Sequence, residues 1–146
     1  VLPVPGFGAA IVPILELAIT LRSAGETVQN AFAELSGAAK KLVSLAVVPN
    51  GDGFASYKIM RCTNALKPDR LSRGNAKTSA FLASEAEKSA TDCVYISHAG
   101  NFELVRRIAT AINETRPTVK IKVGCCSPAT LALASAGAVT VGFVKF

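Results

Sequence analysis

Cysteine is the residue type in this chain whose number and spacing most directly suggest chemistry. The four cysteines are Cys62, Cys93 and the adjacent pair Cys125 and Cys126. An even number of cysteines in a small chain is compatible with two disulfides. A bond between neighbouring cysteines closes a strained ring, so we expect Cys62 and Cys93 to bond to Cys125 and Cys126, in either order. The alternative is four reduced thiols in a cytosolic protein.

Other catalytic or metal-binding patterns are absent from the sequence. No Cys-x-x-Cys spacing occurs, and His98 is the only histidine, so we expect no metal site. His98 ends a predicted strand, a common place for an active-site base, but no Gly-x-Ser-x-Gly nucleophile motif accompanies it. P-loop and dinucleotide fingerprints are missing too. We therefore predict a protein that is not an enzyme and needs no cofactor.

The charge of the chain favours acidic partners. Its formal net charge is +6, and its lysines and arginines are scattered. Anionic lipid, cell-wall polymer, nucleic acid and acidic protein surfaces all attract such a chain. Sheet-based RNA binders place stacking aromatic side chains between their basic residues, and no aromatic residue interleaves here, which argues against nucleic acid. The basic surface residues that we single out are Arg70, Arg73, Lys120 and Lys122.

The N-terminal third of the chain is predicted to be helical. Residues 9–22 form a predicted helix that is apolar nearly all round, and residues 26–47 form a predicted amphipathic helix. A helix without a polar face is buried in its own domain, in a partner or in lipid. Contact with a membrane or a partner, including a second copy of the chain, is thus expected of its apolar residues Ile11, Ile14, Leu15, Leu17, Ile19 and Leu21.

Residues 54–146 alternate between predicted strands and helices, which indicates an α/β arrangement. Residues 67–75 form a predicted basic loop, Asn101 is a predicted helix cap, and Ser127-Pro128 is predicted to open a short helix. The predicted strand 118–126 carries Lys120 and Lys122 on one face, whereas a central strand of a doubly covered parallel sheet is almost continuously apolar. We therefore predict an α+β two-layer sandwich, with helices on one face of a largely antiparallel sheet and solvent on the other. A hydrophobic helical region, 1–48, precedes it. The 146 residues suit a single domain.

This pattern resembles the secreted killer toxins encoded by fungi and their viruses. The similarity is one of architecture: a small α/β sandwich with Cys62, Cys93, Cys125 and Cys126 as its disulfide cysteines, and a separate hydrophobic helix at 11–21. The resemblance implies a secreted, extracellular, antifungal protein that acts on the membrane or surface of target cells. Two alternatives stay open: a structural protein that self-assembles through its apolar helix, and a small basic protein that binds nucleic acid.

Overall fold

A six-stranded mixed sheet forms the centre of the computed structural model, which describes residues 4, 6–51, 53–62 and 66–146. The strands are β1 (Leu42–Pro49), β2 (Ser56–Cys62), β3 (Leu66–Arg73), β4 (Cys93–His98), β5 (Lys120–Cys125) and β6 (Val139–Val144). Their order across the sheet is β3-β2-β1-β6-β4-β5. Only β4 and β5 are parallel among the described pairs, so the predicted two-layer α/β fold with a largely antiparallel sheet is confirmed.

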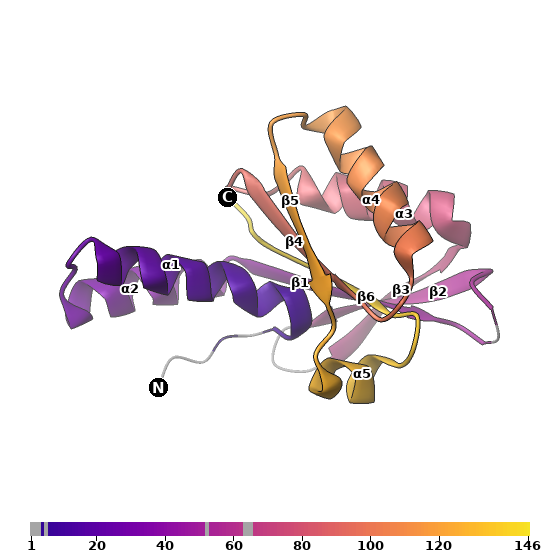
Figure 1. Ribbon diagram of the computed structural model, residues 1–146, viewed down its shortest axis with the longest axis horizontal. Helices are drawn as coiled ribbons and strands as arrows, with labels where there is room; N and C mark the ends of the chain where they lie inside the picture. The colour runs from indigo at the N-terminus through magenta and orange to yellow at the C-terminus, as the bar shows by residue number, and fades with distance from the viewer. Residues whose placement is uncertain (1–3, 5, 52, 63–65) are drawn as a thin grey trace.

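Two helices, α3 (Gly74–Ala86) and α4 (Phe102–Thr115), cover one face of this sheet (Figure 1). The Asn101 side chain begins α4 by accepting a hydrogen bond from the Leu104 backbone N–H, as its sequence position predicted. Every second residue of β1 faces these helices, so Val43, Leu45 and Val47 belong to the main hydrophobic core. Apolar side chains of α4 complete that core: Leu104, Val105, Ile108 and Ile112.

The opposite face of β6 is covered by a short 3-10 turn, η1 (Gly8–Ile11), which leads directly into α1 (Val12–Ser23). Thr140 and Gly142 face this turn because they alternate along β6 with the core residues Val139 and Val141. Gly142 leaves room for the backbone of Ala10, and Thr140 accepts a hydrogen bond from the Ala9 N–H. This face of the sheet, which we expected to be solvated, is therefore partly closed.

The apolar residues of the expected helix 9–22 do not share one environment. Helix α1 pairs with α2 (Val28–Lys40) in a hairpin that projects from the side of the sheet (Figure 1). Its residues divide between environments: Ile14 is buried, whereas Leu15 and Ile19 are 56% and 64% exposed. Within the described residues, no helix combines the length and apolarity that crossing a bilayer requires.

The second predicted helix, 26–47, ends too late, because its last part is a strand. Helix α2 stops at Lys40, and β1 follows from Leu42. Leu42 and Ala46 continue the helical spacing of apolar residues, which explains the wrong boundary. The β-branched Val43, Val47 and Val48 favour the extended conformation, and β1 is a central strand buried on both faces. The predicted basic loop 67–75 is likewise mostly β3, an edge strand.

Candidate functional site

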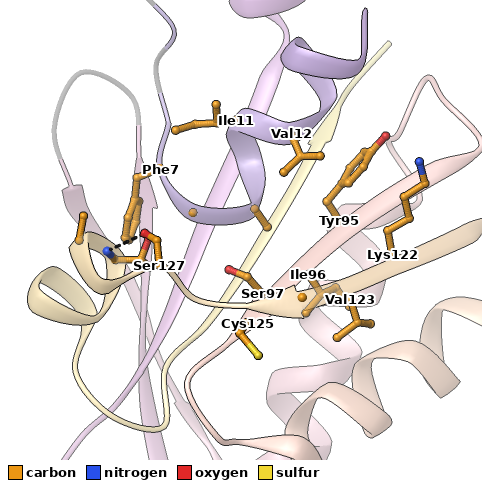
Figure 2. A pocket seen from close by; sticks show the side chains of 15 residues that line it. Phe7, Ile11, Val12, Tyr95, Ile96, Ser97, Lys122, Val123, Cys125 and Ser127 are labelled. Atoms are coloured by element: carbon orange, nitrogen blue, oxygen red, sulfur yellow. Dashed lines mark hydrogen bonds between the residues drawn. The ribbon is translucent and has the colours of Figure 1, made fainter. Parts of the chain in front are cut away.

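A cavity of about 440 Å³ lies between η1, the start of α1, the strands β4 and β5, and the short helix α5 (Pro128–Ala134) (Figure 2). Its size is in the range of pockets that hold small-molecule ligands. Most of its surface is apolar, and the polar groups concentrate at two ends. Figure 2 shows the oxygen of Tyr95 and the nitrogen of Lys122 together at one end, with Phe7 and Ser127 at the other.

The parallel pairing of β4 with β5 builds one wall of the cavity. Tyr95 is in register with Lys122, and Ser97 with Gly124. Residues in register on neighbouring parallel strands place their side chains on the same face. Gly124 therefore stands where any larger residue would project into the cavity, and a Cβ built there meets no atom within 4 Å.

The opposite wall consists of Phe7, Ile11 and Val12. Hydrogen bonds hold this wall on the sheet: the Ala9 N–H donates to Thr140 Oγ1 at 3.0 Å, and the Phe7 N–H donates to Ser44 Oγ at 3.4 Å. Thr140 Oγ1 also lies 2.6 Å from Ser97 Oγ, so one buried hydroxyl connects both walls. The apolar wall is thus fixed by polar contacts behind it.

At one end of the cavity, Glu16 of α1 meets Lys122 and Tyr95. Lys122 Nζ donates to Glu16 Oε1 at 2.6 Å, and the Tyr95 hydroxyl donates to Glu16 Oε2. These hydrogen bonds, from Lys122 first and then from Tyr95, hold the pKa of the Glu16 carboxyl below its ordinary value. Burial and the neighbouring Glu16 raise the pKa of the Tyr95 hydroxyl, so this group remains a proton donor.

At the other end, Ser127 begins α5 by accepting a hydrogen bond from the Thr130 N–H at 3.2 Å. The sequence Ser127-Pro128 predicted this cap and the helix after it, and both are confirmed. The Ser127 and Thr130 hydroxyls are also 3.0 Å apart. This end is polar but uncharged.

The residues singled out from the sequence are spread over the molecule. Of the six apolar residues, Ile11 lines the cavity, Ile14 is buried, and Leu17 and Leu21 are partly buried on the hairpin. The basic residues divide between the two edges of the sheet: Arg70 and Arg73 are on β3, and Lys120 and Lys122 on β5. Lys122 is the one that reaches the cavity.

Three residues of the site were missed in the sequence: Glu16, Tyr95 and Gly124. Glu16 gave a usable signal, because it is the only charged residue between positions 9 and 21, within an otherwise apolar helix. Tyr95 and Gly124 gave none, because their importance depends on the register between β4 and β5.

The predicted disulfides are wrong. Among the described residues no disulfide is present, and the sheet topology explains why. Cys62 is on β2, and three strands, β1, β6 and β4, lie between β2 and β5. Neighbouring strands are about 4.8 Å apart, so Cys62 is much more than ~10 Å from the cysteines at the end of β5. Cys93 begins β4, in register with Lys120, whereas Cys125 ends β5. The Cα atoms of bonded cysteines lie within about 7 Å, so neither predicted pairing is possible in this fold.

Metal binding has no support in the described part of the chain, where no three His, Cys, Asp or Glu side chains come together. His98 is not among the residues that line the cavity. Its Nδ1 accepts a hydrogen bond from the Gly100 N–H at 3.2 Å, and its ring packs against Phe102.

Comparisons with known proteins show which fold this is. No protein-family model and no curated protein matches the sequence. Among solved structures, the Streptococcus pneumoniae fatty acid kinase B3 protein, loaded with linoleic acid, matches with a TM-score of 0.83 and 16% identity over 95% of this chain. A DegV family protein from Eubacterium eligens, loaded with heptadecanoic acid, matches with a TM-score of 0.80 and 14% identity over 93% of this chain. A Thermotoga maritima protein described as revealing a fatty acid binding function matches with a TM-score of 0.77 and 17% identity over 93% of this chain.

These neighbours correct the functional prediction. They are fatty-acid-binding proteins, so the resemblance to fungal killer toxins is wrong, and with it the antifungal action on a target-cell membrane or surface. They favour neither alternative, the self-assembling structural protein or the nucleic-acid-binding protein. The predicted extracellular location stays a prediction. The chain spans 57% of the length of the first two neighbours and shares with them the fold of the DegV family proteins.

Proposed function

We propose that this protein binds a long-chain fatty acid, with the acyl chain in the cavity between η1, β4, β5 and α5. The observation that carries the proposal is an apolar cavity of about 440 Å³ in a fold whose neighbours hold fatty acids. Each methylene group moved from water into such a cavity contributes about 0.8 kcal/mol. A long acyl chain therefore gains affinity from length alone and needs few polar contacts.

The distribution of polar groups supports the same ligand class. A fatty acid is apolar over most of its length and polar at one end. The cavity offers a charged polar end at Lys122 and Tyr95 and a mostly apolar surface beyond it, to which Phe7, Ile11 and Val12 contribute. Hydroxyl groups away from this end, such as that of Ser97, already have hydrogen-bond partners within the protein.

We propose binding rather than catalysis. His98, the only histidine, is held by Gly100 and Phe102 and is not part of the cavity lining. Ser97 has Thr140 and Cys126 as neighbours but no base within the described contacts. A nucleophile without a base to activate it does not support acyl transfer.

Gly124 offers a direct test. In Gly124→Trp, the indole would project into the cavity, whereas in Gly37→Trp the same side chain would stand in solvent on α2, where a Cβ also meets no atom within 4 Å. We expect Gly124→Trp to weaken oleate binding at least about tenfold and Gly37→Trp to leave it unchanged. Binding is measured on delipidated protein by displacement of a fluorescent fatty acid and by native mass spectrometry.

Far-UV circular dichroism and the melting temperature verify that both variants fold. Because the natural chain contains no tryptophan, each variant also carries a single tryptophan at a known place, which can be excited selectively. A brominated fatty acid should not quench Trp fluorescence in the Gly37 variant while still binding it. Equal oleate affinity in both variants would rule out this cavity as the binding site.

A further inference from the structure

The carboxylate of Glu16 is held in an arrangement that resembles the recognition of a ligand. Two hydrogen-bond donors from neighbouring strands reach it, one to each oxygen: Lys122 Nζ to Oε1 at 2.6 Å, and the Tyr95 hydroxyl to Oε2. Glu16 is distant from both in sequence, so this contact exists only because the fold places α1 beside β4 and β5. A carboxylate that accepts one charged and one neutral hydrogen bond is bound more firmly than either donor alone would achieve.

Both donors, unlike Glu16, belong to the cavity lining. Among the described residues that line it, Lys122 is the only one with a charged side chain. Its Nζ also lies 5.4 Å from the centre of the Tyr95 ring, which keeps the ammonium group beside the hydroxyl-bearing ring. A fatty acid whose tail runs toward Phe7 and Ser127 would bring its head group to these two donors (Figure 2).

We infer that Tyr95 and Lys122 form the carboxylate clamp of the fatty-acid site, and that Glu16 occupies this clamp when no ligand is bound. The inference rests on the proposed function. It adds that the carboxylate end of the ligand is recognised and that Glu16 competes with this carboxylate for the clamp. The ligand's carboxylate and the Glu16 carboxylate are both pure acceptors with two oxygens, so they present the same chemistry to the clamp. They also repel one another, so only one can be bound fully at a time.

Two consequences distinguish this clamp from a merely structural ion pair. First, Tyr95 is only 6% exposed, so its hydroxyl needs an acceptor both with and without bound ligand. A ligand carboxylate supplies this acceptor and replaces Glu16 fully. A fatty alcohol offers no negative charge to Lys122. Second, departure of Glu16 removes the polar contacts that connect α1 to β4 and β5, so ligand binding loosens the hairpin at this end.

The experiment compares oleate with oleyl alcohol, both below the concentrations at which they aggregate, in the full chain and in variants. Lys122→Met and Tyr95→Phe should weaken oleate binding about tenfold and leave the alcohol unchanged, because only the carboxylate uses the clamp. Glu16→Gln should strengthen oleate binding about tenfold, again without effect on the alcohol. Matched controls are Lys120→Met, on the same strand and face but outside the cavity lining, and Glu34→Gln on the exposed side of α2.

The outcomes separate this inference from the proposed function. If the natural chain binds neither ligand, the proposed function is wrong and the clamp with it. If both ligands bind and every variant keeps the same preference for oleate over the alcohol, the proposal that the cavity binds the acyl chain is retained and the clamp is overturned. If Glu16→Gln weakens oleate binding as Lys122→Met does, Glu16 positions the clamp instead of competing for it, and that part of the inference is overturned.

Discussion

Gly142 of β6 and Ala10 of η1 are in direct backbone contact: a Cβ built on Gly142 would lie 2.2 Å from the Ala10 Cα and 2.6 Å from its nitrogen. A side chain of any size is incompatible with these distances. The turn that forms one wall of the cavity can therefore rest on the sheet only because position 142 is glycine.

Replacement of Gly142 by alanine should displace η1 and lower the free energy of unfolding by about 2–3 kcal/mol. It should also weaken fatty-acid binding, because Phe7, Ile11 and Val12 move with the turn.

Urea denaturation measures the loss of stability, and displacement of a fluorescent fatty acid measures the loss of binding. Gly124→Ala is the control, because a Cβ at position 124 meets no atom within 4 Å, and we expect it to change stability by less than about 0.5 kcal/mol. Equal stability of the two variants would show that η1 does not rest on β6.

The Thr140 hydroxyl should contribute to the same wall through hydrogen bonds. It accepts from the Ala9 N–H and pairs with Ser97 Oγ, and Thr140 itself is 1% exposed. Thr140→Val keeps the shape of the side chain but removes the acceptor of the Ala9 N–H and the stronger partner of Ser97 Oγ, so we expect a loss of about 1–3 kcal/mol in urea denaturation. Thr115→Val, at an exposed hydroxyl near the end of α4, is the control and should cost far less. Similar losses at both positions would contradict the role of Thr140.

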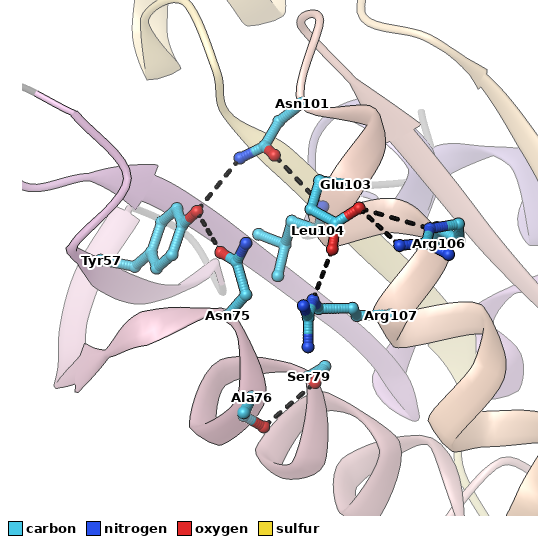
Figure 3. Close-up of polar contacts among 9 residues, drawn as sticks. All are labelled: Tyr57, Asn75, Ala76, Ser79, Asn101, Glu103, Leu104, Arg106 and Arg107. Atoms are coloured by element: carbon cyan, nitrogen blue, oxygen red, sulfur yellow. Dashed lines mark hydrogen bonds and ion pairs between the residues drawn. The ribbon is translucent and has the colours of Figure 1, made fainter.

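Two helix caps in this chain should differ in their value for stability. Asn101 caps α4, and its Nδ2 also donates to the Tyr57 hydroxyl at 3.3 Å (Figure 3). The same Nδ2 donates to Gly137 O at 3.1 Å. Thr27 caps α2 at an exposed site through the Asn30 N–H alone. We expect Asn101→Ala to cost about 2–3 kcal/mol and Thr27→Ala about 1 kcal/mol or less in urea denaturation. A loss at Thr27 as large as that at Asn101 would show that the buried contacts of Asn101 add nothing.

Local signals explain why much of the second half of the fold was predictable. Asn101 and Ser127 are caps that act on residues three positions away, so their effect can be read from the sequence. The strand from Lys120 was recognisable because one of its faces is polar, as befits an edge strand. The strand from Leu42 was misread because its apolar residues fit helical spacing as well as an extended, doubly buried strand.

The site was not predictable in the same way. Tyr95 and Lys122 meet because β4 and β5 run parallel in one register, and strand order depends on contacts between residues far apart in sequence. The same argument holds for the cysteines: their number suggested disulfides, but the distances between them are set by which strands separate them. Of the site residues that were missed, only Glu16, a lone charge in a largely apolar helix, carried a local signal.

The ion cluster around Glu85 should make the stability of the protein depend on pH. The Glu85 side chain is 11% exposed and accepts hydrogen bonds from Lys88 Nζ and from Arg61 Nη2, the latter at 3.0 Å. Burial alone would raise the pKa of the Glu85 carboxyl, but the hydrogen bonds from Lys88 and Arg61 outweigh burial and hold the pKa below its ordinary value.

A carboxyl whose pKa is lower in the folded state stabilises the fold fully above its unfolded pKa, about 4.3 for glutamate, and loses this contribution as the pH falls through the folded pKa. Glu85→Gln should therefore cost about 1–2 kcal/mol at pH 7, and the difference from the natural chain should shrink steadily below pH ~4. Urea denaturation at several pH values between about 7 and 3 measures this difference. Glu103→Gln serves as the control, because Glu103 pairs with Arg106 and Arg107 in solvent, where ion pairs contribute little. A difference between Glu85→Gln and the natural chain that stays constant down to pH ~3 would show that the pKa of Glu85 is the same in the folded and unfolded states.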